Sequence, residues 1–284
     1  MTRAKVLGAV LLIIGLSAAG RPVQAQAEVG ADLGLFSAYV WRGVSLTNKP
    51  VAQPAVYLTI PAGNASVALG GWANVELGRY DDPLDHFSQS GGVSSFDLSE
   101  FDPYAEISFP VGIATLTGGA IGYIYPNDFG ATSDINTVEL YATAALGVPL
   151  SPELTIYYDI DKVDGAYLEG SVSHSQPLGE TVSLDLGALA GLSAGQDAEV
   201  DADGEPQAEV YNFLDNGLTH LDLSAGIPLT AGAFSITPTV HLLVNGDDAT
   251  KLTSPSSDGD LKLWGGVSIG WARGLGEGPK EGAE

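Results

Sequence analysis

Apolar side chains alternate with small or polar ones along this chain, and this period of two residues limits the fold more than any other feature. The clearest run lies between residues 66 and 77, with its apolar face at Val67, Leu69, Gly71, Ala73, Val75 and Leu77. The same alternation recurs in residues 138–148 and 261–271. Because successive side chains of a strand point to opposite faces, each run indicates a β-strand with one apolar face. Twelve candidate strands of this kind follow one another.

Helices that could cross a membrane are not expected after residue 27, because no apolar stretch there approaches about 18 residues. The chain is nevertheless 45% hydrophobic. A membrane protein without such helices satisfies its backbone in lipid only by closing a sheet on itself. A strand crosses at a tilt with about 9 to 11 residues, and the alternating segments are long enough.

The connections between the candidate strands fall into two kinds. Short turns that begin with Pro occur at every second connection, at 61–64, 110–112, 149–152, 177–179 and 228–232. Between them lie mostly longer acidic connections, at 42–53, 79–99, 126–136, 194–218 and 245–259, with 161–165 as the short exception. Outer-membrane barrels have short periplasmic turns and long extracellular loops. The prediction is an all-β, transmembrane antiparallel up-and-down barrel of about 12 strands.

A soluble β-sandwich or jelly roll is the alternative fold, because it also alternates and also has turns. Its exposed face should be rich in Lys, Thr and charged residues. In most of the candidate strands the more hydrophobic face is nearly uncharged, and the other face is small and polar. This difference favours the barrel.

The N-terminus has the pattern of a secretory signal. Arg3 and Lys5 precede an apolar run over residues 6–19, and small-residue cleavage patterns follow at 23–25 and 25–27. The predicted organisation is a signal peptide at 1–27, an outer-membrane β-barrel at 28–274 and a flexible acidic tail at 275–284. The expected location is the outer membrane, with outer-membrane lipid and the barrel-assembly machinery as partners.

The charge balance excludes several classes of protein. The chain has 35 acidic and 11 basic residues. Removing the signal takes away Arg3, Lys5 and Arg21, which leaves 35 against 8 and a formal charge of −27. Nucleic acid is therefore not expected as a partner, because phosphate binding needs clustered Lys and Arg. The chain has no Cys, so disulfides are excluded.

Two sets of residues are candidates for a role in a barrel. Aromatic side chains near strand ends are expected in the girdles at the two membrane interfaces, at Trp41, Tyr57, Phe109, Tyr125, Tyr158, Phe234 and Trp271. Charged side chains on the polar faces are expected to line the pore or its rim, at Arg42, Glu76, Glu106, Glu139, Asp159, Glu169, Asp185, Asp222 and Lys262. The acids would favour cations over anions. Alternatively, they form a hydrogen-bonded plug that conducts nothing.

Metal and catalytic chemistry are less well supported. Residues 199–204 carry alternating acids before Gly204, as an EF-hand loop does, but Val210 stands where the bidentate Glu should be. His174 and Ser175 are adjacent and so point to opposite faces of a strand. His220, Asp222 and Ser224 share a face, but neighbours there lie about 7 Å apart. We therefore predict no enzyme, metal or cofactor.

Residues 31–46 contain the segment Ser37-Ala38-Tyr39-Val40-Trp41-Arg42-Gly43, and a Pro- and Gln-containing segment follows at 50–54. This opening resembles the TorF-like family of outer-membrane porins over about 25 residues. The resemblance implies an outer-membrane barrel with a pore role. One departure is that Trp271 does not end the chain, although such barrels usually finish on an aromatic residue that the assembly machinery recognises.

Three functions follow as hypotheses. The leading one is an outer-membrane porin for passive diffusion of small polar or cationic solutes. The second is a non-conducting structural or adhesive barrel that binds a partner or divalent ions through its acidic loops. The third is a lipid-modifying outer-membrane enzyme.

Overall fold

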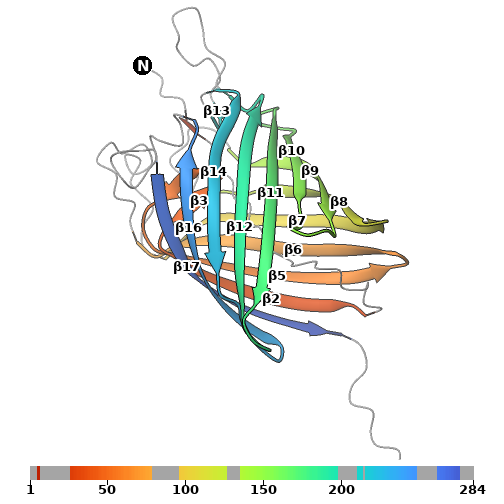
Figure 1. Cartoon of the computed structure of the whole chain (residues 1–284). Helices are drawn as coiled ribbons and strands as arrows, with labels where there is room; N and C mark the ends of the chain where they lie inside the picture. Colours follow the sequence, from red (N-terminus) through yellow and green to blue (C-terminus); the bar gives the residue numbers. More distant parts are fainter. Residues whose placement is uncertain are drawn as a thin grey trace, which may run out of the picture.

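The computed structural model describes residues 5–6, 26–78, 96–126, 135–197, 210–213, 215–247 and 261–275. Twelve strands form a closed antiparallel barrel (Figure 1). They are β2 (Glu28–Phe36), β5 (Val51–Ala62), β6 (Ala65–Glu76), β7 (Asp97–Val111), β8 (Ala114–Tyr123), β9 (Thr137–Leu146), β10 (Glu153–Asp159), β11 (Ala166–Pro177), β12 (Ser183–Ala194), β14 (Gly217–Gly226), β16 (Phe234–Asn245) and β17 (Leu261–Gly274). No helix among these residues is long and apolar enough to cross a membrane.

The ring closes because the first and last barrel strands pair with each other. β17 runs antiparallel to β2, with a register from Gly266↔Phe36 to Gly274↔Glu28. All other neighbours in the ring are consecutive strands, and β14 pairs directly with β16 beside the short strand β15 (Leu229–Ala231). A closed ring leaves no free strand edge, so the barrel backbone is satisfied internally. The predicted fold class is confirmed.

Turn length divides the two ends of the barrel as predicted. The short connections after β5, β7 and β15 contain Gly63, Gly112 and Gly232, with φ of 67°, 64° and 63°. This left-handed backbone is easily adopted by Gly, which explains the residue at these tight turns. β2 begins and β17 ends on this side. The strand ends that border the longer connections lie at the opposite end, which we call the long-loop end.

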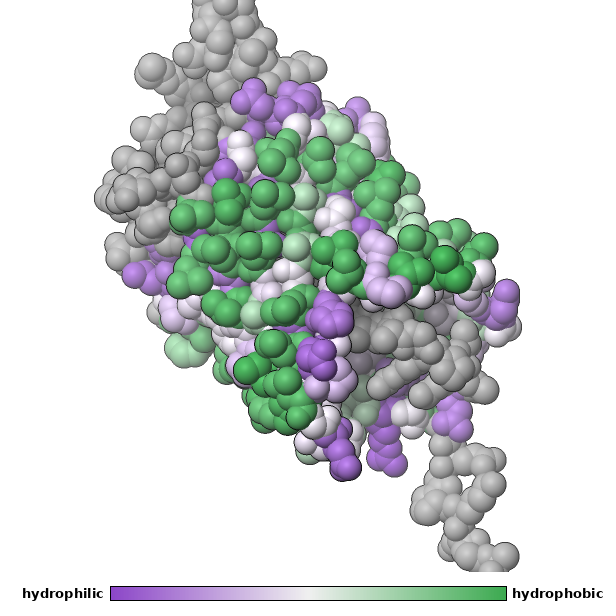
Figure 2. All heavy atoms as spheres, viewed as in Figure 1, coloured by the Kyte–Doolittle hydropathy of each residue, from purple (hydrophilic) through white to green (hydrophobic). Residues whose placement is uncertain are grey.

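Alternation separates the two faces of the barrel wall. In β6, Ala68, Trp72, Asn74 and Glu76 are buried toward the interior, whereas Leu69 on the outer face is 48% exposed. Large exposed apolar side chains occupy the outer face of nearly every strand, and Figure 2 shows them as a broad hydrophobic surface. At the end of β8, Tyr123 points into the barrel, and the next residue, Ile124, points outward.

Two further pairs of short strands stand apart from the ring. β3 (Tyr39–Trp41) and β4 (Val44–Thr47) form a two-stranded antiparallel sheet of their own between β2 and β5. β1 (Lys5–Val6) pairs in parallel with β13 (Val210–Tyr211). β1 falls within the predicted signal peptide, but residues 1–4 and 7–25 lie outside the described residues, as do residues 276–284 of the expected tail. The signal peptide and the tail therefore stay predictions.

Candidate functional site in the barrel lumen

The connection between β2 and β5 folds into the barrel instead of extending away from it. Its two strands, β3 and β4, are joined by Arg42 and Gly43, whose φ angles of 44° and 88° match the positive pair of a type I′ turn. The residues from Ala38 to Thr47 are buried except for Val40 and Leu46, which are half-buried. We call residues 38–47 the lumen hairpin.

Arg42 at the tip of the lumen hairpin is held by the opposite wall. Its Nη1 donates to Oε1 of Glu139 at 2.8 Å, and its Nη2 donates to Oε2 at 2.7 Å. Nη1 also donates to Oε1 of Gln196 at 3.3 Å. This two-pronged contact is the strongest geometry for a guanidinium and a carboxylate. Burial lowers the pKa of Arg42, but the charge of Glu139, its hydrogen bonds and the nearby Tyr123 and Tyr167 together raise that pKa above its ordinary value.

Aromatic rings surround the same guanidinium. Its central carbon lies 4.1 Å from the ring centre of Tyr167, 4.7 Å from that of Tyr157 and 4.6 Å from that of Trp41. A cation over an aromatic face is attracted by the negative charge of the ring face, and more strongly when water is excluded. We call the four barrel-side residues Glu139, Gln196, Tyr157 and Tyr167 the cation cage.

Hydrogen bonds within the cage and from residues around it orient its polar groups. Tyr123 donates to Oε2 of Glu139 at 2.8 Å, and Gln196 donates to Oε1 of Glu139 at 3.1 Å. Asn212 donates to Oε1 of Gln196 at 2.9 Å. With the two bonds from Arg42, the buried carboxylate of Glu139 therefore accepts four hydrogen bonds. Such a charge is tolerable in the interior because it is both paired and fully hydrogen-bonded.

Two more contacts fasten the lumen hairpin to other parts of the ring. The hydroxyl of Tyr39 donates to Oε2 of Glu100 on β7 at 2.5 Å. Nζ of Lys262 on β17 donates to the carbonyl oxygen of Gly43 at 2.6 Å. Since β7, β9 and β17 lie on different parts of the ring, the hairpin crosses the lumen rather than lying along one wall.

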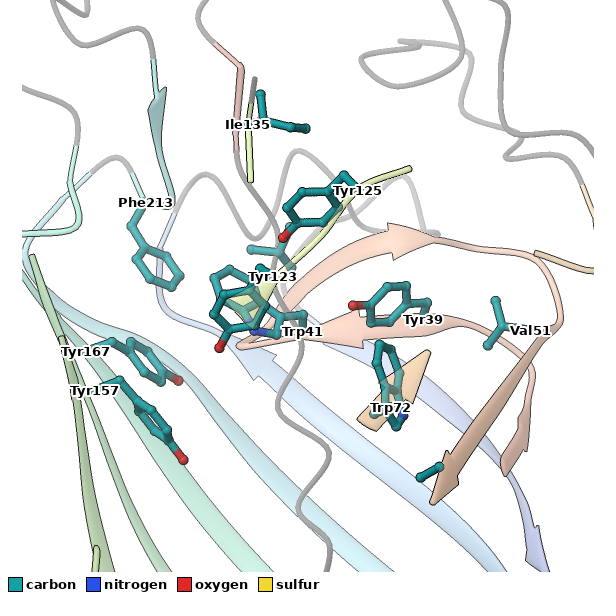
Figure 3. Close-up of a cluster of buried hydrophobic side chains, with 12 residues drawn as sticks. Tyr39, Trp41, Val51, Trp72, Tyr123, Tyr125, Ile135, Tyr157, Tyr167 and Phe213 are labelled. Carbon is teal, nitrogen blue, oxygen red and sulfur yellow. The ribbon is translucent and has the colours of Figure 1, made fainter. Parts of the chain in front are cut away.

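A cluster of aromatic side chains fills the long-loop half of the lumen around the hairpin (Figure 3). Trp41 stacks on Phe213 with ring centres 6.2 Å apart, and Phe213 stacks on Tyr167 at 5.6 Å. Trp72 lies 5.7 Å from Tyr39. These contacts bury Trp41 to 1% exposure. The interior at this level is therefore a packed mixture of rings and paired charges.

The other half of the lumen is less filled. Tyr57, Tyr104 and Tyr141 are only half-buried there, and their rings cover Gly30, Gly70 and Gly119 of adjacent strands. A Cβ on any of these glycines would come within 2.5 Å of a ring atom, so the glycines make room for the tyrosines. Glu106 accepts from the hydroxyl of Tyr141 at 2.5 Å. This half presents hydroxyls and carboxylates to the interior.

All nine predicted pore or rim residues fall on the inner side of the barrel. Arg42 and Glu139 meet, Glu169 adjoins Tyr167 at 3.3 Å and Lys262 reaches Gly43. Glu106 contacts Tyr141, and the remaining four take part in separate contacts along the lumen. Glu76 accepts from Asn74 and Ser99, Asp159 accepts from the backbone of 161–163 and from Thr137, Asp185 accepts from Ser175 and Ser183, and Asp222 contacts His241. Their role in permeation stays a prediction.

Three of the seven predicted girdle residues do not face lipid. Trp41 and Tyr125 are 1% and 2% exposed and belong to the lumenal cluster, and Tyr57 faces the lumen over Gly30. The prediction was wrong for Trp41 because β2 ends at Phe36 and the following residues turn inward. The remaining four lie on the outer face, with Phe109, Tyr158 and Phe234 exposed and Trp271 half-buried.

His220, Asp222 and Ser224 do not assemble as a catalytic triad. His220 contacts Thr219 at 3.0 Å, whereas Asp222 contacts His241 at 3.1 Å. Ser175 donates to Asp185 rather than to His174.

The acidic loop at 199–204 lies outside the described residues, and the described residues hold no group of three or more potential metal ligands.

Sequence reasoning missed the inward path of the lumen hairpin and three cage residues, Gln196, Tyr157 and Tyr167. The available signal was Arg42-Gly43 between two short apolar segments, which fits a two-residue turn. The sequence indicated the inward direction of Tyr157 and Tyr167 more weakly. Each tyrosine lies two residues from an acid that was predicted to point inward, Asp159 or Glu169, and therefore shares its face of the strand.

Comparison with known proteins gives a family and a fold. Residues 21–201 match the model of a family described as "Bacterial protein of unknown function (Gcw_chp)". An outer membrane channel from Pseudomonas putida F1 has 12% identity and a TM-score of 0.51, with 88% of this chain and 96% of that chain covered. LpxR from Salmonella typhimurium has 6% identity and a TM-score of 0.49, with coverage of 86% and 99%. No curated protein matches the sequence.

The likeness to the channel lies in the fold, which is that of an outer-membrane barrel. The barrel expected from the sequence is therefore confirmed. The TorF-like resemblance and the role of its motif stay predictions.

Proposed function

The chain belongs to the Gcw_chp family of bacterial proteins of unknown function, and from this starting point we propose an outer-membrane channel for small polar or cationic solutes. In this proposal the lumen hairpin is the element that narrows the passage. Passive diffusion through the polar lumen needs no cofactor. The partners are outer-membrane lipid, the assembly machinery and the permeating solutes.

The observation that carries the proposal is the excess of carboxylates facing the described part of the lumen. They include Asp32, Glu76, Glu100, Asp102, Glu106, Glu139, Asp159, Glu169, Asp185 and Asp222. Arg42 and Lys262 are the basic side chains that oppose them there. A lumen with this balance raises the local concentration of cations and repels anions. Its half-buried hydroxyls, such as the pair Ser108 and Thr117, also suit uncharged polar solutes.

The outer surface supports the location of the proposed channel. Exposed Leu, Ile, Val and Phe side chains cover the outside of the ring, including Val56, Ile107 and Leu140. An apolar surface of this extent would promote association in water, whereas the lipid interior is itself apolar. An outer-membrane setting therefore accounts for both faces of the wall.

Planar-bilayer recording of the full mature chain tests the channel. We expect small cation-selective currents from the wild type and larger currents when residues 38–47 are replaced by a short Gly-Ser linker. Glu106 lies in the less filled half of the lumen. Because Glu106→Gln removes a negative charge there, it should lower the cation-to-anion permeability ratio. The matched control is Glu180→Gln in an exposed turn, which should leave the ratio unchanged.

A non-conducting structural or adhesive barrel is the second candidate, and the packed rings around Trp41 favour it. It predicts no current from the wild type and none from the linker variant. Normal folding of both proteins, seen as heat-dependent gel migration, would then exclude misassembly as the cause. That combined result would reject the channel and support the structural barrel.

A further inference from the structure

We propose that the cation cage is a binding site for a guanidinium group, and that Arg42 occupies it as an internal ligand. A solute with a terminal guanidinium group would compete with Arg42 for Glu139, Tyr157 and Tyr167. This inference deepens the proposed channel function, because displacement of Arg42 would release the element that narrows the passage. The ligand class is a small organic cation bearing a guanidinium.

The shape of the site selects this class. Glu139 presents both carboxylate oxygens in one plane to two parallel N–H groups. Tyr167 and Tyr157 place ring centres 4.1 and 4.7 Å from the guanidinium carbon. A flat guanidinium satisfies the carboxylate and both rings together, whereas a compact ammonium acts as a point charge. The cage should therefore prefer guanidinium to ammonium.

The cage is positioned by barrel strands and by the connections after β10 and β12, and not by the hairpin. Tyr123 on β8 orients Glu139, while Asn212 and the carbonyl of Gly165 hold the two ends of the Gln196 amide. Tyr157 and Tyr167 face each other from neighbouring strands, with ring centres 6.2 Å apart. None of these contacts involves residues 38–47. The site is thus organised in advance for a cation, whichever molecule supplies it.

The hairpin that carries Arg42 is held to the ring by hydrogen bonds of the Tyr39, Arg42 and Lys262 side chains and not by strand pairing, so Arg42 can leave the cage without breaking a barrel ladder. β3 and β4 pair with each other in a separate sheet and not with the barrel strands. The φ of 44° at Arg42 belongs to the two-residue turn of the hairpin, so the side chain can leave the cage while the turn keeps its backbone conformation. Because Arg42 is tethered, its effective concentration is on the order of millimolar, and a free solute must reach that range to compete.

Binding of methylguanidinium to the full mature chain in detergent tests the inference by calorimetry. Arg42→Ala should bind methylguanidinium at least tenfold more tightly than the wild type, because its cage is vacant. Methylammonium, the matched cation, should bind to Arg42→Ala at least tenfold more weakly than methylguanidinium does. Adding Glu139→Gln to Arg42→Ala should abolish binding. Equal binding of the two cations, or no binding by a folded Arg42→Ala protein, would overturn the proposal.

A second measurement covers the case in which Arg42→Ala does not fold. In the wild type, millimolar methylguanidinium should expose Trp41 and shift its fluorescence, and Trp41→Phe should remove that shift. Constant Trp41 emission across the titration would contradict exchange at the cage. Neither measurement depends on an ionic current. Guanidinium binding without conductance would reject the proposed channel function and support the binding site. Conductance without guanidinium binding would support the channel and reject the binding site.

Discussion

Arg42 and Glu139, separated by 97 residues in the chain, join two opposite parts of the barrel through two hydrogen bonds of 2.8 and 2.7 Å. Their side chains are 0% and 2% exposed. The pair links the tip of the lumen hairpin to β9. Removing one partner should therefore have a larger effect than removing both.

Glu139→Ala leaves the Arg42 guanidinium buried without its carboxylate. We expect a loss of about 3 to 5 kcal/mol in the free energy of unfolding, as for other broken buried pairs. The double variant Arg42→Met with Glu139→Leu should lose less than Glu139→Ala alone, because no unpaired charge remains. Urea unfolding of the protein in detergent measures both values. A double variant that is less stable than Glu139→Ala would contradict this account.

Stability should fall in alkaline solution through Tyr39. Burial, followed by the charges of Glu100 and Asp102, raises the pKa of Tyr39 well above its ordinary value of 10.0. A group whose pKa is higher in the folded than in the unfolded state adds to the free energy of unfolding. For Tyr39 this contribution is complete below pH 10 and is lost as the pH rises through the pKa of the folded state. Tyr39→Phe removes this dependence, so its urea-unfolding free energy should fall less steeply above pH 10 than that of the wild type. Parallel curves for the two proteins would count against the prediction.

Gly70→Val should disturb the packing of Tyr104 inside the barrel. A Cβ at residue 70 would lie 2.4 Å from the Tyr104 ring, which is closer than atoms can approach. We expect a destabilisation of about 1 to 3 kcal/mol, the usual range for overpacking. Gly170→Ala is the control, since a Cβ there meets nothing within 4 Å. Unfolding curves should separate the two variants, and equal stability would show that Tyr104 moves away freely.

Leu69→Arg tests whether the outer face contacts lipid. Leu69 is 48% exposed on the outside of β6. In a water-soluble protein this surface change would alter stability by about 0.5 kcal/mol or less. In a membrane barrel the same change costs about 2 to 4 kcal/mol near the middle of the bilayer. Unfolding from lipid vesicles measures the cost, with Leu178→Arg in an exposed turn as the control that should be nearly neutral.

The barrel could be predicted because its causes are local. The period of two in residues 66–77 specifies which side chains of β6 face outward, and Pro and Gly mark the turns. Even the inward direction of Glu139 and Glu169 followed from alternation within a single strand. The girdle prediction failed at Trp41, Tyr57 and Tyr125, because nearness to a strand end does not reveal which face a ring occupies.

The local pattern of the chain thus specified strands, faces, turn lengths and a lumen rich in acids, since each depends on neighbouring residues. The inward path of residues 38–47 and the meeting of Arg42 with Glu139, Gln196, Tyr157 and Tyr167 depend on closure of the ring, which brings together segments up to 154 residues apart. The alternation of residues along one strand does not indicate which residues of other strands contact Arg42. The partner is selected because a buried guanidinium must find a carboxylate and aromatic faces, and the closed barrel offers them together at this place.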